Sequence, residues 1–262
     1  MKKIICLLVV LLSFSLVACS SSNEADSQTV EETSEKPKLL MATEATFQPY
    51  EYYDGDEIIG IDVEIAGAIA EKLGMELEVN DVEFDSIIPG VMAGKYDIGA
   101  AGMTVTDERL EQVNFTDSYA TGVQVVIVNE DSPITSIDNL FDESVEDLLV
   151  GTQTGTTGFL YATWDIEEAE LGTVKAFQKT TDAAQALVNK QIDCILLDNE
   201  PAKAIVKNNT GLKILDSQYA VEDYAIAIKK DNIELLEKVN AALNELIADG
   251  TVKTIVDKYI GG

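Results

Sequence analysis

The sequence has no histidine, a single arginine and only three cysteines among its 262 residues. Without histidine, neither a metal site with imidazole ligands nor a histidine general base can form. Lysine and arginine together number 18 against 47 acidic residues, which gives a net charge of −29. A surface this acidic repels nucleic acid and is not attracted to anionic lipid, although solubility alone accounts for most of the charge. The composition therefore predicts no nucleic-acid partner, and nothing in it indicates a metal or another cofactor.

Long apolar runs are also scarce, and the clearest one lies at the N-terminus. Two lysines precede residues 4–17, which are almost wholly apolar. This run is shorter than the roughly 20 residues of a membrane-spanning helix, so it predicts a secretory signal peptide over residues 1–18. It ends in small residues before Cys19 and resembles a bacterial lipobox, which implies a lipid on Cys19. The alternative is an ordinary signal peptide with an incidental cysteine.

Cleavage at this point changes both the charge and the cysteine content. The first 18 residues carry two lysines and no acid, so the net charge of the remaining chain becomes −31. Cys6 is removed and Cys19 is lipidated, which leaves Cys194 in the apolar run 192–197 as a buried structural thiol without a disulfide partner. Residues 19–37 are rich in Ser, Thr and Glu and predict a flexible, lipidated tether.

The rest of the chain alternates between two kinds of apolar pattern. Strands are expected at 38–43, 75–79, 96–101, 123–128, 148–152, 173–177, 192–197 and 224–228. Helices are expected at 62–73, 86–93, from about 156, 183–188, from about 201, 234–248 and 252–259. Gly74 stands where a helix commonly ends. This alternation predicts an α/β architecture with mainly parallel strand pairing. Residues 92–97 and 189–193 lead into apolar strands in a similar way, which suggests two related lobes.

Polar residues that follow strands are the first candidates for a binding site, because ligands of open α/β sheets lie beyond the carboxyl ends of the strands. Gly102 permits a close backbone approach, and Thr106 is suited to cap a helix that carries the only arginine, Arg109. The Arg109 guanidinium is either a structural ion-pair hub or a bidentate clamp for a carboxylate.

The second half of the chain offers two comparable features. Residues 151–158 (GTQTGTTG) form a Gly/Thr loop between a strand and a helix, which suits an anion at a helix N-terminus or an ordinary capping turn. Asp198 ends an apolar run just before a helix, where its carboxylate can bind an ammonium group or simply cap the helix.

Five motifs in order resemble those of the extracellular solute-binding proteins of family 3, the amino-acid receptors of ABC importers. They are residues 42–51 (ATEATFQPYE), 59–64 (IGIDVE), 84–89 (FDSIIP), 102–109 (GMTVTDER) and 114–119 (NFTDSY). The resemblance covers residues 38–260. It implies a two-lobed periplasmic-binding-protein-like clamp of type II, a Venus flytrap with two hinge crossovers. Lobe 1 would comprise residues 38–121 and 225–262, and lobe 2 residues 122–224.

The resemblance also implies a role for ten residues. Phe47 and Phe84 would flank the ligand side chain, and Asp198 would bind the α-ammonium group. The α-carboxylate would be held by the backbone at Gly102 and by Thr104, Arg109, Thr156 and Thr157. Glu44 and Gln153 would contact the far end of the ligand. Ala101 departs from family members that have serine there, so one hydrogen bond to the ligand is expected to be missing or bridged by water.

The expected ligand is a polar α-amino acid. A carboxylate at Glu44 and two aromatic rings that can flank the ligand side chain favour arginine, lysine or histidine. Glutamine comes next, and an acidic ligand is disfavoured. The chain is expected to be a monomer outside the cytoplasm that delivers its ligand to an ABC permease. Two alternatives are a cyclohexadienyl or arogenate dehydratase-like enzyme on the same scaffold and an amino-acid sensor. We expect no catalytic activity, since the carboxylate and ammonium contacts already form a complete binding site.

Overall fold

The computed structural model describes residues 36–142, 145–216 and 218–261. The predicted signal peptide, the lipidation site Cys19 and nearly all of the predicted tether lie outside these residues. Among the described helices, none combines the length and the apolar character needed to cross a membrane. Residues 36–262 group into a single folding unit, and the two sheets described below belong to it.

The first sheet has the strand order β5-β1-β6-β14-β7. Its strands are β1 (Lys38–Thr43), β5 (Glu76–Asp81), β6 (Ile98–Gly99), β7 (Val113–Phe115) and β14 (Ala227–Lys229). Its helices are α1 (Ile61–Lys72), α2 (Phe84–Met92), α3 (Asp107–Gln112), α7 (Ile233–Ala248) and α8 (Thr251–Ile260). A small side sheet joins β2 (Thr46–Phe47), β3 (Glu51–Asp54) and β4 (Glu57–Ile59). We call these elements together lobe 1.

The second sheet has the order β10-β9-β11-β8-β12, with β13 paired to β8. Its strands are β8 (Ala120–Asn129), β9 (Leu148–Gln153), β10 (Gly172–Phe177), β11 (Cys194–Asp198), β12 (Leu212–Ile214) and β13 (Ala220–Tyr224). Its helical elements are η1 (Ile137–Leu140), α4 (Thr157–Ala162), η2 (Thr163–Glu167), α5 (Thr180–Val188) and α6 (Asn199–Asn208). We call these elements lobe 2. The two lobes confirm the predicted two-lobed α/β fold.

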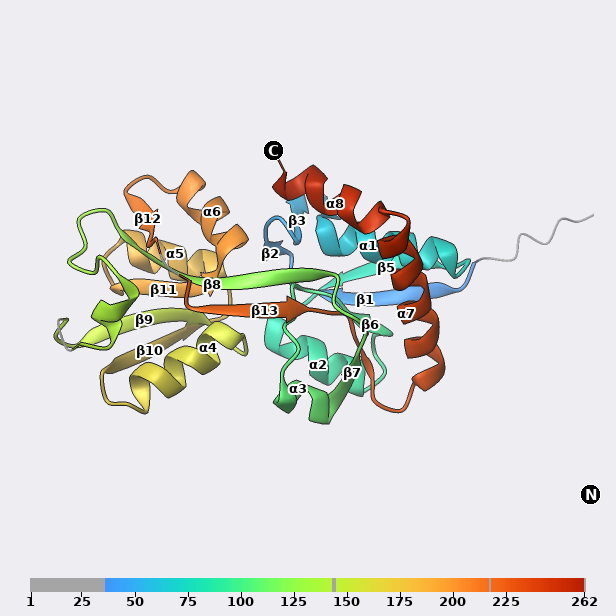
Figure 1. Ribbon diagram of the computed structural model, residues 1–262, viewed down its shortest axis with the longest axis horizontal. Helices are drawn as coiled ribbons and strands as arrows, with labels where there is room; N and C mark the ends of the chain where they lie inside the picture. The colour runs from blue at the N-terminus through green and yellow to red at the C-terminus, as the bar shows by residue number, and fades with distance from the viewer. Residues whose placement is uncertain (1–35, 143–144, 217, 262) are drawn as a thin grey trace, which may run out of the picture. The chain divides into compact units, whose positions relative to one another are not determined.

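The chain passes between the two sheets twice, from β7 to β8 and from β13 to β14. Figure 1 shows β8 and β13 lying side by side along the line that joins the lobes. Their antiparallel register places Gly122 opposite Glu222, two positions from Ala120, which is opposite Tyr224. A side chain at Gly122 would have its Cβ 2.2 Å from the Tyr224 ring, so glycine at this position leaves room for that ring against the strand.

Each lobe has its own apolar core. In lobe 1, α1 buries Ile61, Ile65 and Ile69 against the sheet, at the spacing that the sequence predicts. Leu73 then caps the helix and Gly74 follows with φ of +69°, the left-handed conformation of a helix C-terminus. In lobe 2, Cys194 is fully buried with a free thiol, and burial raises its pKa. The prediction of a buried structural thiol is confirmed.

Most predicted elements are present, but three expectations are wrong in detail. Pairing is parallel for β1 with β5 and β6 and for β9 with β10 and β11, whereas β7, β8 and β12–β14 pair antiparallel. Each of these antiparallel pairs includes β8 or β14, the strands that follow the two passages of the chain between the sheets. The strand expected at 96–101 is shorter, because only Ile98–Gly99 pairs with neighbouring strands. The strand expected at 224–228 is two strands, because β13 ends in one sheet and β14 begins in the other.

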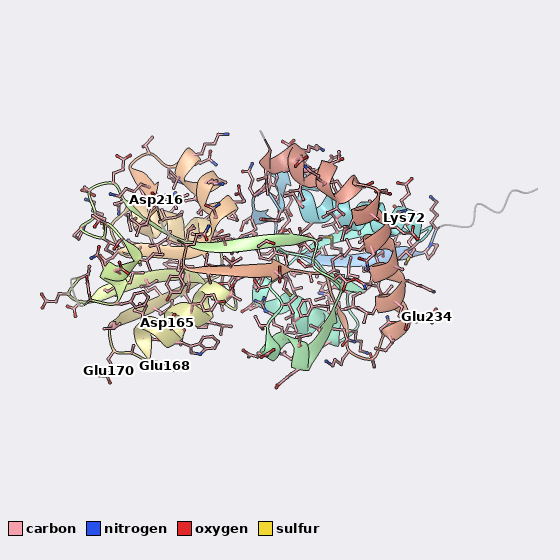
Figure 2. The ribbon with its side chains drawn as sticks, in the orientation of Figure 1. Lys72, Asp165, Glu168, Glu170, Asp216 and Glu234 are labelled. Atoms are coloured by element: carbon pink, nitrogen blue, oxygen red, sulfur yellow. The ribbon has the colours of Figure 1, made fainter. Side chains whose placement is uncertain are left out.

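Much of the acidic charge lies on the outer surface. Figure 2 labels Asp165, Glu168 and Glu170 near η2, and all three are exposed. Lys72, labelled in lobe 1, pairs with Glu245 at 3.0 Å on the surface. Exposed acids of this kind favour solubility and make little net contribution to folding.

Candidate ligand-binding site

One pocket brings together all ten residues that the sequence singled out, together with Ala101 and Glu51. Its lining comes from both lobes: Glu44, Phe47, Glu51, Phe84, Ala101, Gly102, Thr104 and Arg109 from lobe 1, and Gln153, Thr156, Thr157 and Asp198 from lobe 2. Most of these residues follow the carboxyl ends of β1, β5, β6, β9 and β11, in a turn or in the first turn of the next helix, whereas Phe47 and Glu51 lie on the side-sheet strands β2 and β3. The topology therefore brings together side chains that are far apart in the sequence.

Arg109 is the only guanidinium in this pocket and is 6 % exposed. Thr106 accepts a hydrogen bond from the Arg109 backbone N–H, which confirms its predicted capping role. The guanidinium lies over the Phe84 ring, 5.4 Å from its centroid, and donates from Nη1 to the Thr104 carbonyl at 2.7 Å and from Nη2 to the Gly155 carbonyl at 3.0 Å. Gly155 belongs to lobe 2, so Arg109 links the lobes. The Arg109 side chain makes no ion pair within the described residues, which argues against the hub interpretation.

Asp198 occupies the N-cap position of α6, but its side chain does not cap the helix. Instead the carboxylate is 7 % exposed and accepts a hydrogen bond from the Tyr224 hydroxyl. Burial, followed by the negative charge of Glu222, raises the pKa of Asp198 to about 7. A buried carboxyl that titrates near neutrality favours a cation at this position, because a nearby positive charge stabilises its ionised form.

Glu44 and Gln153 lie together at another part of the pocket wall. Glu44 is 2 % exposed, and the Thr46 hydroxyl lies 2.7 Å and 2.8 Å from its two carboxylate oxygens. Burial raises the pKa of Glu44, while hydrogen bonds from Thr46 and Gln153 oppose that shift. Gln153 Nε2 donates to the carbonyl of Gln178 at 2.9 Å, which fixes the direction of the amide. This corner of the pocket is thus rich in acceptors.

The threonines and Gly102 already have partners inside the protein. The Thr156 hydroxyl caps α4 by accepting from Phe159 N, and it donates to the Gln153 carbonyl. The Thr104 and Thr157 hydroxyls both donate to Glu222. Gly102 has φ of +51°, and its N–H donates to Asp62 Oδ2 at 2.7 Å.

An acidic pair, Glu51 in the pocket lining and Asp62 behind it, was not predicted. Asp62 is 1 % exposed and accepts hydrogen bonds from Gly102 N and from the Tyr119 hydroxyl, both at 2.7 Å. Burial raises the pKa of Asp62 to about 6. Burial and the charge of Asp62 raise the pKa of Glu51 well above its usual value. Both acids fall inside the motifs 42–51 and 59–64, but no single-residue pattern distinguishes them from exposed acids.

The pocket is narrow because the two lobes meet across it. The cavity volume of the pocket is about 10 Å³, roughly enough for one water molecule. An α-amino acid is much larger, so its entry requires the walls to separate, and a two-lobed protein can achieve this by rotating one lobe against the other.

Solved structures with the same architecture identify the class of protein. An ancestral arginine-binding protein bound to arginine matches with a TM-score of 0.80 and 37% identity, covering 86% of this chain and 99% of that one. An ancestral arginine-binding protein bound to glutamine matches with a TM-score of 0.78 and 38% identity, covering 87% of this chain and 99% of that one. The fold and the interlobe pocket are therefore those of a two-lobed binding protein.

The sequence places the chain within one family of that class. The model of the bacterial extracellular solute-binding proteins, family 3, matches residues 39–262. A relative in Bacillus subtilis (strain 168), the arginine-binding extracellular protein ArtP, is 34% identical over 100% of this chain and 99% of its own length. The chain belongs to the bacterial extracellular solute-binding proteins of family 3.

Proposed function

We propose that the protein is the binding component of an ABC importer for a basic amino acid, with arginine as its ligand. The observation that carries this proposal is the presence of the buried Glu44 carboxylate in the same pocket as Arg109 and Asp198. Arginine has three charged groups, and the pocket offers a group of opposite charge for each of them. The α-carboxylate would bind Arg109, the α-ammonium Asp198 and the guanidinium Glu44.

The surroundings of these three groups support the assignment. Phe47 and Phe84 line the pocket and supply apolar surface for the aliphatic stem of the ligand. Gln153 adds an amide next to Glu44, and a planar guanidinium with five donors can use both. An acidic ligand would place a second carboxylate against Glu44, and the pocket lining has no lysine to offset it, while its one arginine, Arg109, would bind the α-carboxylate.

Arg109 would exchange partners when the ligand binds. Its hydrogen bonds to the carbonyls of Thr104 and Gly155 use two of its five N–H donors. A carboxylate is a stronger acceptor than a carbonyl, so the ligand would take over part of this hydrogen bonding and connect the lobes through itself. Binding would thus favour the closed arrangement, with hinges at the two points where the chain crosses between the sheets. Lobe 1 would then comprise residues 38–121 and 225–262, and lobe 2 residues 122–224.

The test is a thermal-shift and calorimetric survey of residues 36–262, unfolded and refolded to remove carried ligand, against the twenty common amino acids. A ligand at about 1,000 times its Kd should raise stability by about 4 kcal/mol. We expect the largest shift with arginine. Glu44→Gln should remove the preference for arginine, whereas Glu76→Gln, a change at an exposed position in lobe 1, should leave it intact. A chain that responds to none of the twenty amino acids refutes the proposal.

Glutamine is the second candidate ligand. A similar structure holds glutamine in an ancestral arginine-binding protein, and the pair Glu44 and Gln153 can accept from and donate to a side-chain amide. In this case glutamine alone would produce a large shift, and Glu44→Gln would weaken its binding only modestly, because a hydrogen bond between neutral groups replaces one to a charge.

The cellular setting that we propose follows from the N-terminal segment. The signal peptide would direct the chain out of the cytoplasm, and a lipid on Cys19 would hold it at the membrane beside the permease, with residues 19–37 as the tether. Cys19→Ala in the full-length chain should release the protein from the membrane fraction into the soluble fraction. Retention of this variant in the membrane fraction would contradict the lipid anchor.

A further inference from the structure

A buried carboxylate on β13 joins the two lobes next to the pocket. Glu222 is 5 % exposed, and its Oε2 accepts three hydrogen bonds. The donors are the Thr104 hydroxyl at 2.9 Å, the Thr157 hydroxyl at 3.0 Å and Gln124 Nε2 at 3.1 Å. Thr104 belongs to lobe 1, Thr157 begins α4 in lobe 2, and Gln124 lies on the crossing strand β8. One oxygen atom therefore collects donors from both sides of the interlobe pocket.

This arrangement fixes the direction of two pocket hydroxyls. A threonine hydroxyl has one proton and two acceptor lone pairs. When Thr104 and Thr157 give their protons to Glu222, only oxygen lone pairs remain available to the pocket that both residues line. One lone pair of Thr157 already accepts from Gln124 Nε2 at 3.4 Å, which leaves the other for the pocket. The expected role of Thr104 as a donor to a ligand carboxylate would require its proton to leave Glu222.

We propose that Glu222 is a positioning residue that holds the lobes in their closed arrangement by accepting the hydroxyl protons of Thr104 and Thr157, and thereby presents both oxygens to the ligand as acceptors. The part of this proposal that concerns the ligand rests on the proposed function, whereas the closure of the lobes does not. Glu222 itself is not part of the pocket lining, so it acts through the two threonines.

A purely structural role explains Glu222 less well. Its other oxygen, Oε1, is buried without a hydrogen-bond partner among the described residues, and an unpartnered buried acceptor is unfavourable. The neighbouring Val221 is 65 % exposed, so β13 turns its apolar residue outward and its acid inward. Burial lowers the pKa of Arg109, and the negative charge of Glu222 opposes that shift. Glu222 therefore also favours the charged form of the guanidinium that lines the pocket.

The test compares Glu222→Gln with Asp223→Asn, the same chemical change at the exposed neighbour on the same strand. Spin labels at Glu168→Cys in lobe 2 and Glu234→Cys in lobe 1, both labelled in Figure 2, report the distance between the lobes without any ligand. Glutamine keeps one oxygen that can take the place of Oε2, but this oxygen is neutral, so all three hydrogen bonds lose their charged acceptor and weaken. We expect the ratio of closed to open molecules to fall about tenfold in Glu222→Gln, the equivalent of one hydrogen bond to a charged group, and not to change in Asp223→Asn.

Further measurements keep the outcome decisive. Thr157→Val removes one donor and should also favour the open form, and its effect should be smaller in the Glu222→Gln background than in the wild type. If the Glu222→Gln variant does not fold, Thr157→Val provides the test in its place. An unchanged distance distribution in both variants overturns the proposal, as does a wild type found only in the open form. A lowered unfolding temperature without a change in distance would show a structural role alone and would overturn it as well.

Arginine titrations then separate this inference from the proposed function. If the wild type binds arginine, Glu222→Gln should weaken the affinity about tenfold, and equal affinity in the two proteins refutes the positioning role toward the ligand. If the wild type binds no amino acid, the proposed function fails, while the label distances still decide whether Glu222 holds the lobes together.

Discussion

Ligand affinity should depend strongly on pH through Asp198. Its pKa of about 7 in the ligand-free protein reflects burial first and the charge of Glu222 second. Because an ammonium ion pairs with the ionised carboxylate, a proton on Asp198 competes with the ligand. Each pH unit below the pKa then weakens the apparent affinity about tenfold, or about 1.4 kcal/mol. Between pH 8 and pH 5 the expected loss is about a hundredfold.

Stability of the ligand-free protein should change in the opposite direction. The pKa of Asp198 is raised above its usual value of 3.8, so the folded protein binds a proton that the unfolded chain has already released. The free energy of unfolding therefore increases as the pH falls from about 7 toward about 4. Asp62, with a pKa of about 6, adds a contribution of the same sign below pH 6.

Isothermal titration calorimetry with arginine in buffers of different ionisation enthalpy measures both the affinity and the protons released. About one proton per bound ligand should be released near pH 6, where Asp198 is still mostly protonated in the free protein. Asp198→Asn should bind weakly at pH 8 and lose most of the pH dependence; any remaining slope would come from Glu44, whose pKa burial also raises. An affinity that does not change from pH 8 to pH 5, or a full slope in Asp198→Asn, would refute this reasoning.

Three further variants test other parts of the molecule. Glu44→Gln should weaken arginine binding by about tenfold or more while changing glutamine binding little, because only the guanidinium loses a charged partner; competition calorimetry measures the ratio, and an equal effect on both ligands would contradict it. Arg109→Lys should lower the affinity for every amino acid by about a hundredfold, since a single ammonium cannot serve a carboxylate and the two carbonyls of Thr104 and Gly155 together; a loss below threefold would be inconsistent with the clamp. Gly122→Ala should cost about 1–3 kcal/mol of unfolding free energy, because its Cβ would overlap the Tyr224 ring, whereas Gly67→Ala in α1, 4.0 Å from Leu77, should stabilise by up to about 1 kcal/mol; chemical denaturation would expose the error if the two changes had equal effects.

The sequence predicted elements best where local signals agreed. The stripe of Ile61, Ile65 and Ile69 with Gly74 at its end located α1 to within about one residue, because periodicity and capping act over a few residues. The side sheet β2-β3-β4 was missed, since strands of two to four residues give too short a pattern. The division between β13 and β14 was also invisible, because it depends on which sheet each segment joins and not on its own residues.

The site residues that the sequence predicted and the one that it missed occupy different kinds of position in the fold. Arg109 and Asp198 stand at strand-to-helix junctions, where the topology of an α/β sheet directs attention. Glu222 lies within a strand between Val221 and Asp223, and alternation of hydrophobicity alone would have turned Val221 inward. The useful signal was Tyr224: a buried tyrosine two residues away implies that Glu222 faces the same side of β13.

The acids around the pocket finally indicate what kind of ligand suits it. Burial raises the pKa of Glu51, Asp62, Asp198 and Glu44, and Arg109 is the only guanidinium in the pocket lining. Such a group of carboxyls resists ionisation in the absence of positive charge, because like charges and low polarity act together. A ligand with two cationic groups and one anionic group supplies the missing charge and favours the ionised forms of Asp198 and Glu44. The protons that stabilise the ligand-free protein in acid are thus the ones that arginine must displace, which is why affinity and stability should have opposite pH dependences.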